Sequence, residues 1–297
     1  MFTKRALPNI RRTLAIASGK GGVGKTTVAV NLALALHSRG ARVGIFDADI
    51  FGPNVPLMLG VHRREAGGGF VPVARRLQAA PYIQPLERYG LQVMSMGLIV
   101  AEDQLINPLA ETVGQIVVET LRSIVWSELD YLLIDLPPSA GQPQQDLVNR
   151  VAIDGVVVVT TPQDLSLLDS SRSLRLFHEA GAPVLGLVEN MSYFICPSCG
   201  DRHEIFQHSE RWRPAALQDV RILGRLPLTA NISRGIDRTH PLMANFDAQA
   251  GGDRPASELT EARAFIDIAG EVEAALARLE AERSENGDRN GARPSSS

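Results

Sequence analysis

The chain has 297 residues, of which 44% are hydrophobic and 21% charged, with a formal net charge of −3 and an isoelectric point near 6.1. No apolar run approaches the roughly 20 residues that span a bilayer. The N-terminus also lacks the apolar stretch of a signal peptide. The mildly acidic balance disfavours a nucleic-acid-binding surface, which is usually strongly basic. We therefore expect a globular cytoplasmic protein with neither nucleic acid nor a membrane as partner.

Residues 18–27 read SGKGGVGKTT, and residues 19–26 fit the phosphate-loop pattern G-x-x-x-x-G-K-[ST]. Glycines let backbone N–H groups approach phosphate oxygens. Lys25 places a positive charge on the terminal phosphates, and the Thr26 hydroxyl is suited to Mg²⁺. A short apolar strand at 14–17 precedes the loop and a helix at 27–38 follows it, which is the required setting. The predicted nucleotide-binding residues of this loop are Gly19, Lys20, Gly21, Gly22, Val23, Gly24, Lys25, Thr26 and Thr27.

Carboxylates end two further predicted strands. Residues 42–49 form the first, which ends with Asp47 and Asp49, and residues 130–138 contain the second, in which four apolar residues lead into Asp135. Acids at the carboxyl ends of strands beside a phosphate loop lie where ligands bind in open α/β sheets. Asp135 fits a Walker B acid that holds the Mg²⁺ water shell. A plainer alternative for Asp47 and Asp49 is that both cap the turn.

Alternating strands and helices continue down the chain. An apolar β-branched run at 155–162 predicts a central strand, 164–180 a helix, and 184–191 a strand with Asn190 at its end. A strand at 221–228 and a helix at 261–279 follow. The pattern indicates an α/β fold with a mostly parallel central sheet and helices on both faces. We expect an N-terminal arm at 1–12, one P-loop ATPase domain at 13–280 and a disordered tail at 281–297.

Cys196 and Cys199 form a C-x-x-C pair on a Pro/Gly turn. Such a turn aims two thiolates at one point, whereas zinc or an iron–sulfur cluster takes four ligands. His203 and His208 lie nearby and offer a zinc site within one subunit. Alternatively, a second copy of the chain supplies two more thiolates across a twofold axis. A purely structural pair is the remaining interpretation.

The chain resembles the Mrp family of ATP-binding iron–sulfur cluster carriers, whose phosphate loop is the deviant form of MinD and ParA ATPases. The resemblance rests on SGKGGVGKTT, DADIFGPN, MSMG, ELDYLLIDLPP, VVVTTPQDLSLLD, VENMSYFICPSCG and ILGRLPL, in one order from about residue 13 to 228. It implies a SIMIBI-type P-loop NTPase that hydrolyses ATP as a homodimer. By the same resemblance, two subunits hold a 4Fe–4S cluster between them and deliver it to apo iron–sulfur proteins, with cluster assembly factors as further partners.

The resemblance also implies roles for single residues. Lys20 would reach the partner's nucleotide, so that Lys20, Lys25 and Asp49 are the catalytic residues, with Asp49 orienting the attacking water. Asp47 would support Mg²⁺ or the loop, and Asn190 would hydrogen-bond the adenine. Thr26 and Asp135 would serve Mg²⁺, and Cys196 and Cys199 the cluster.

Three segments depart from the family pattern, at residues 107–110, 139–142 and 207–211, and we expect any altered coupling of ATP to the cluster to arise there. Two other functions fit the same motifs. One is a scaffold that binds nucleotide and zinc without transferring a cluster. The other is a positioning ATPase like ParA or MinD.

Overall fold

The computed structural model describes residues 3–62, 65, 83–99, 110–138, 141–196, 198–206, 215–229, 231–232, 239–244, 246 and 256–291. The strands run in chain order as β1 (Ile10–Ser18), β2 (Val43–Asp47), β3 (Leu86–Arg88), β4 (Leu91–Ser95), β5 (Leu129–Asp135), β6 (Gly155–Thr160), β7 (Val184–Ile195), β8 (Arg202–His203) and β9 (Ile222–Leu228). The helices are α1 (Lys25–Ser38), α2 (Val55–Leu59), α4 (Met96–Ile99), α5 (Ala110–Ser123), α6 (Gln142–Arg150), α7 (Asp164–Glu179), α8 (Ala215–Gln218) and α10 (Ala256–Gly291).

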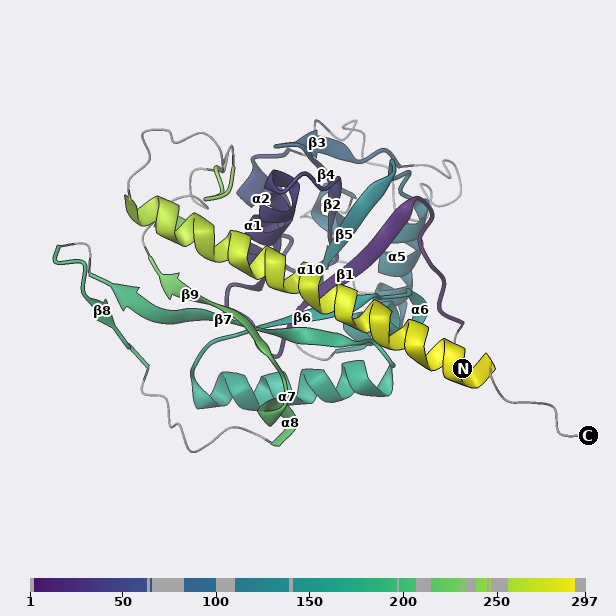
Figure 1. Cartoon of the computed structure of the whole chain (residues 1–297). Coiled ribbons are helices and arrows are strands. Elements are labelled where there is room, and N and C mark those ends of the chain that lie inside the picture. Colours follow the sequence, from purple (N-terminus) through teal and green to yellow (C-terminus); the bar gives the residue numbers. More distant parts are fainter. Residues whose placement is uncertain are drawn as a thin grey trace, which may run out of the picture.

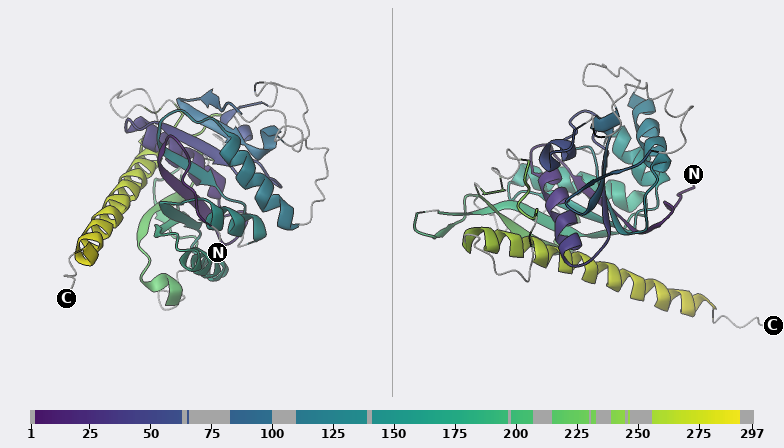
Figure 2. Two further views of the ribbon diagram at one scale, coloured as in Figure 1. Left: turned by 90° about the vertical axis from the view of Figure 1, so that its right-hand side faces the viewer. Right: turned by 90° about the horizontal axis from the view of Figure 1, so that it is seen from above.

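These strands form one nine-stranded sheet in the order β3-β4-β2-β5-β1-β6-β7-β8, with β9 also paired to β7. Neighbouring strands are parallel along the order β4-β2-β5-β1-β6-β7, and β9 is parallel to β7. The strands β3 and β8 run antiparallel to their neighbours. Helices α1 and α10 pack together on one face, and α5, α6 and α7 cover the other (Figures 1 and 2). The predicted α/β fold, with a mostly parallel sheet between two helical layers, is confirmed.

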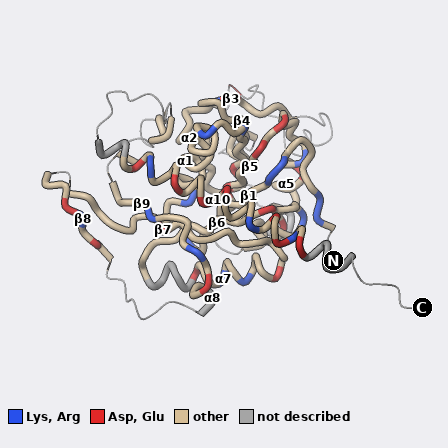
Figure 3. Tube along the Cα trace, in the orientation of Figure 1, with Lys and Arg blue, Asp and Glu red and all other residues tan. Residues whose placement is uncertain are grey.

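Burial explains why the central elements are so apolar. All residues of β6, GVVVVT, are buried, as expected for a parallel strand covered on both faces. Helix α1 is rich in Ala, Val and Leu, and is buried on nearly all sides between the sheet and α10. Charged residues of both signs are interspersed along the described trace (Figure 3). Within the described residues, no helix is both long enough and apolar enough to cross a bilayer.

The expected arm at 1–12 is wrong in part. Residues 10–12 already belong to β1, where Ile10 pairs with Leu129 of β5. Before them, the N–H of Arg5 donates to Arg150 O at 3.1 Å, and the N–H of Ala152 donates to Arg5 O at 3.0 Å. Backbone pairing of this kind holds a segment in place even where its basic side chains face solvent.

The expected disordered tail at 281–297 is also wrong over its first part, because α10 continues to Gly291. Residues 281–285 are exposed helix, and Glu, Ala and Arg there are good helix formers that need no apolar contact to extend a helix already begun. Residues 292–297 lie outside the described part of the chain.

Candidate functional site

The phosphate loop lies between the end of β1 and the start of α1. Gly24 stands directly before α1 with φ of 83°, a left-handed conformation that glycine adopts without strain. A Cβ on Gly19 would lie 2.2 Å from the backbone carbon of Asp169, so only glycine lets the loop approach α7 this closely. The strand–loop–helix arrangement expected from the sequence is therefore present.

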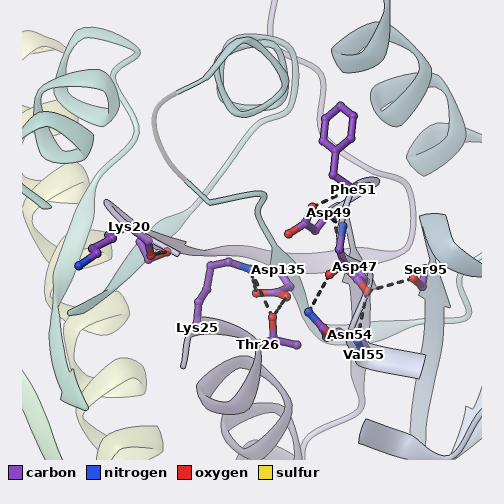
Figure 4. A network of polar contacts seen from close by, with 12 residues as sticks. Lys20, Lys25, Thr26, Asp47, Asp49, Phe51, Asn54, Val55, Ser95 and Asp135 are labelled. Atoms are coloured by element: carbon purple, nitrogen blue, oxygen red, sulfur yellow. Dashed lines mark hydrogen bonds and ion pairs between the residues drawn. The ribbon is translucent and has the colours of Figure 1, made fainter. Parts of the chain in front are cut away.

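Lys25, Thr26 and Asp135 meet in the loop (Figure 4). The Lys25 ammonium lies 2.6 Å from Oδ1 of Asp135, and the Thr26 hydroxyl donates to Oδ2 at 2.7 Å. Lys25 is 7% exposed and Asp135 is fully buried. Burial raises the pKa of Asp135, while the ammonium and hydroxyl that contact the carboxylate oppose that rise. Two neighbouring oxygen donors, a hydroxyl and a carboxylate, are a fitting set for Mg²⁺.

Asp47 lies next to Asp135 across the β2–β5 ladder and organises the segment that follows β2. Its Oδ1 accepts the N–H of Asp49 at 3.1 Å, and its Oδ2 accepts the N–H of Val55 at 3.1 Å and the Ser95 hydroxyl at 3.0 Å. Burial, and secondarily the charge of Asp135, raises the pKa of Asp47 to about 8. Asp47 thus holds the segment after β2 in place, and its expected role toward Mg²⁺ or the phosphate loop stays a prediction.

Asp49 begins the turn that leaves β2. Its Oδ1 accepts the N–H groups of Phe51 and Gly52 at 3.2 and 3.1 Å. Both acids therefore accept backbone N–H groups of the segment after β2, as the turn-capping alternative expects, and a further role of either acid stays a prediction. Asp49 also lines the hollow beside the phosphate loop, so capping and a role toward a nucleotide are compatible.

Lys20 is exposed and points away from the Lys25–Asp135 pair (Figure 4). Its backbone is held in place, because the Ser18 hydroxyl donates to Lys20 O at 3.0 Å. An extended cation at the rim of the loop reaches outward, which suits contact with another molecule.

Asn190 directly follows the part of β7 that pairs with β6, and its side chain supports the phosphate loop. Its Nδ2 donates to Val23 O at 2.8 Å, and a Cβ on Gly24 would lie 2.2 Å from that nitrogen. The side chain is 6% exposed. Loop support was not among the roles expected for Asn190, and the adenine contact stays a prediction.

The phosphate loop opens into a hollow of about 290 Å³. Its lining includes Ser18, Lys20, Gly21, Gly22, Gly24, Lys25, Thr26, Thr27, Asp49, Gly52, Asn54, Leu57, Met58 and Pro138. A larger hollow of about 880 Å³ is lined mainly by α7 and the segment that follows it, and contains none of the predicted site residues. The smaller hollow is the candidate nucleotide site, because the ionic groups and the loop glycines converge there.

The two cysteines lie far along the chain from this loop, on the hairpin formed by the end of β7 and β8. Both thiols are free, Cys196 partly exposed and Cys199 exposed. The backbone N–H groups of Cys199 and Ser198 lower the pKa of the Cys196 thiol, which favours the thiolate form that binds metals. His203 lies on the same hairpin, whereas His208 falls outside the described residues. So do most of the three departing segments at 107–110, 139–142 and 207–211.

Comparison with known proteins agrees with this geometry. Residues 9–261 match the family described as ParA: NUBPL iron-transfer P-loop NTPase. The chain belongs to this family. The iron-sulfur cluster carrier protein of Aquifex aeolicus is 38% identical to this NUBPL-type NTPase over 270 residues, which are 91% of the chain and 69% of that protein.

Two solved structures share the fold of this NUBPL-type NTPase. The nucleotide-binding protein of Archaeoglobus fulgidus in complex with ADP, with cobalt, is 32% identical with a TM-score of 0.63, covering 78% of the chain and 87% of that protein. The septum site-determining protein MinD of Pyrococcus horikoshii, with Mg-ADP, is 26% identical with a TM-score of 0.60, covering 88% and 95%. The chain is therefore an NTPase of the ParA and MinD type.

Sequence reasoning missed two residues that the structure adds to these sites. Ser95 was part of the MSMG motif, yet its bond to Asp47 depends on β4 pairing with β2, which no local pattern reveals. Asp201 contacts the Cys199 thiol at 3.3 Å. Its place two residues after C-x-x-C, with His203 two further on, was the available signal.

Proposed function

We propose that this NTPase carries iron–sulfur clusters, hydrolysing Mg-ATP as it binds a cluster and delivers it to apo proteins. The observation that supports this most is the pair of free thiols on one hairpin of a ParA-type NTPase. Its relative from Aquifex aeolicus is named an iron-sulfur cluster carrier protein. The chain spans about two thirds of that relative's length.

The nucleotide would bind in the hollow at the phosphate loop. Phosphoryl transfer depends mainly on positioning and charge neutralisation, and Mg²⁺ supplies charge stabilisation on the phosphates when bound. Thr26 and Asp135 would hold that ion, because their oxygens already lie together. Lys25 would bind the terminal phosphates and Asp49 would orient the attacking water. Asn190, with Nδ2 committed to Val23, has Oδ1 to accept a hydrogen bond from the adenine amino group.

Two observations support a homodimer. Lys20 extends outward from the loop, as a residue that serves the partner's nucleotide should. On the segment after β2, Phe51 is 72% exposed and Leu57 is 62% exposed, and Leu57 lines the nucleotide hollow. Large apolar side chains exposed beside a functional site are typical of an interface. A dimer would bury these side chains and bring each Lys20 to the other subunit.

The cluster is cargo, and one subunit offers only two cysteine thiolates for it. Because a 4Fe–4S cluster takes four, we propose that two subunits share one cluster. The recipients would be apo iron–sulfur proteins, with assembly factors as further partners. The cytoplasm, which keeps thiols reduced, is the compartment we propose for this chemistry.

Transfer to a recipient tests this proposal. Protein reconstituted anaerobically with iron and sulfide should restore the activity of an apo 4Fe–4S enzyme, faster with Mg-ATP than without it. Cys196→Ser should abolish the transfer while ATP hydrolysis persists. Reconstituted protein that transfers nothing, with or without nucleotide, would exclude the carrier function.

A further inference from the structure

Backbone hydrogen bonds close the hairpin that carries the two cysteines. Phe194 pairs with His203 and Ile195 with Arg202, and the N–H of Cys196 donates to Asp201 O at 2.9 Å. The N–H of Gly200 then donates back to Cys196 O at 2.8 Å. Figure 1 shows β8 and the end of β7 projecting from the edge of the sheet. The residues of this turn are therefore held by backbone bonds while their side chains stay accessible.

Three metal-binding side chains converge on this turn. One ligand atom each from Cys199, Asp201 and His203 lies within 4.8 Å of the other two. The Cys199 thiol lies 3.3 Å from Oδ2 of Asp201. In a tetrahedral zinc site, neighbouring ligand atoms are separated by about 3.3–3.8 Å, since each lies about 2.0–2.3 Å from the ion. The thiol and the carboxylate already have this spacing, and a small rotation would bring in the imidazole.

The positive charge of Arg202 does not block a cation from the hairpin face that carries Asp201 and His203. Side chains alternate along an extended strand, so Asp201 and His203 share one face while Arg202 points to the other. Arg202 lies over the Tyr193 ring, 3.8 Å from its centroid, and its Nη2 donates to Glu204 at 2.8 Å. The guanidinium is thus turned away from the carboxylate of Asp201. The His203 ring packs beside Phe194, with centroids 6.4 Å apart, which limits its orientations.

We propose that Cys196, Cys199, Asp201 and His203 of a single subunit hold one divalent cation of the borderline class, with Zn²⁺ the best match. The C-x-x-C spacing adds the Cys196 thiolate to the three converging ligands, which completes a tetrahedral set of two sulfurs, one nitrogen and one oxygen. Thiolate and imidazole ligands favour zinc or ferrous iron over Mg²⁺ and Ca²⁺, which prefer oxygen.

This site uses the same thiols as the proposed cluster site, so the two occupancies exclude one another. Asp201 and His203 would complete the ligands of the single ion, whereas the partner's two thiolates would complete the four cysteine ligands of a bridging cluster. A subunit loaded with the single ion would therefore need to release it before sharing a cluster. Only this consequence rests on the proposed function, because the mononuclear site itself needs neither a partner nor ATP.

Cobalt binding tests the site, since Co²⁺ takes tetrahedral zinc positions and its visible and charge-transfer bands report geometry and thiolate ligation. The full chain, reduced and anaerobic without nucleotide, is titrated with Co²⁺ while light scattering records its mass. We expect one Co²⁺ per chain on a monomer, with bands of tetrahedral thiolate coordination. Asp201→Ala and His203→Ala should each weaken binding at least about 10-fold and change the visible bands.

Matched controls remove the same residue types outside the hairpin. Asp219→Ala removes an exposed carboxylate and His62→Ala an exposed histidine, and both variants should bind Co²⁺ like the wild type. Circular dichroism and elution volume show that each variant is folded, and the conservative changes Asp201→Asn and His203→Gln replace any variant that is not. Wild-type affinity and bands in the Asp201 and His203 variants would overturn the proposal, as would half an equivalent of Co²⁺ on a dimer.

The outcome for the cluster is read separately on the same preparations. Failure of the wild type to take up a cluster, with the cobalt pattern as expected, would overturn the carrier function and leave this site in place. Normal cluster uptake, with cobalt binding that is unchanged in the Asp201 and His203 variants, would overturn the mononuclear site and leave the carrier function in place.

Discussion

The Lys25 ammonium and the Asp135 carboxylate, 110 residues apart in the chain, form an ion pair with 2.6 Å between Nζ and Oδ1. The pair joins the two motifs that define the nucleotide site, the phosphate loop and the Walker B strand. It is almost completely buried, so each charge depends on the other and on Thr26 for its stabilisation. The group that would bind phosphate and the group that would hold Mg²⁺ are thus coupled through one contact.

Substitution of Lys25 should therefore affect both activity and stability. Lys25→Ala should lower ATP hydrolysis at least about 100-fold, because charge neutralisation on the phosphates is lost. It should also lower the free energy of unfolding by about 3–5 kcal/mol, since Asp135 is left buried without its partner. Steady-state hydrolysis and denaturant unfolding measure the two effects.

The double variant Lys25→Ala/Asp135→Asn serves as the control for that experiment. It removes the uncompensated carboxylate and should recover much of the lost stability, while hydrolysis stays at least about 100-fold below the wild-type rate. An unchanged hydrolysis rate in Lys25→Ala would remove the lysine from the site.

Substitution of Lys20 should affect activity but leave stability almost unchanged. Lys20→Ala should change the free energy of unfolding by no more than about 0.5 kcal/mol, because the side chain is exposed. If it serves the partner's nucleotide, hydrolysis should fall about 10³-fold, as for other cations supplied across an interface. Arg42→Ala, which removes an exposed cation bonded to Asp130, is the control and should hydrolyse ATP normally. Equal activity of the two variants would contradict the assignment.

Asp47 predicts how stability depends on pH. Its pKa is about 8 in the folded chain against a usual 3.8, so between these values the folded state binds a proton that the unfolded state does not. The contribution of Asp47 to the free energy of unfolding should therefore fall as pH rises from about 4 to 8, by at most about 1.4 kcal/mol per unit. Asp47→Asn should flatten the dependence of the melting temperature on pH in this window.

Ser95→Ala is the matched variant, because it removes a hydrogen bond to the same carboxylate but keeps its titration. It should lower the melting temperature yet retain the slope. Parallel curves for the wild type and Asp47→Asn would show that Asp47 is not the group responsible.

Asn190 offers a test of base recognition. Its Nδ2 donates to Val23 O in the phosphate loop. Because this bond supports the loop, Asn190→Ala should weaken the binding of every nucleotide by about 1 kcal/mol. If Oδ1 accepts from the adenine amino group, ATP should lose more affinity than GTP, whose base presents an oxygen at that position. Calorimetric titration with both nucleotides measures the difference, and equal losses would limit Asn190 to supporting the loop.

Much of this fold and site could be predicted from local sequence patterns. The remaining features could not, and they share one cause: each depends on contacts between distant parts of the chain. The phosphate loop, the Asp135 strand and the buried run of β6 were predictable because glycines, apolar runs and strand-end acids are local signals. The bond from Ser95 to Asp47 depends on strand order, and the pairing of Arg5 with Arg150 depends on tertiary contact. The convergence of Asp201 and His203 with Cys199 likewise required the register of β7 and β8.

The most direct test of the account is the iron, sulfide and mass of the protein reconstituted anaerobically with Mg-ATP. The account predicts dimers that carry four iron atoms and four sulfides per two chains, with Cys196→Ser and Cys199→Ser devoid of both. Protein that takes up no sulfide, or that holds a complete cluster on a single subunit, would contradict it.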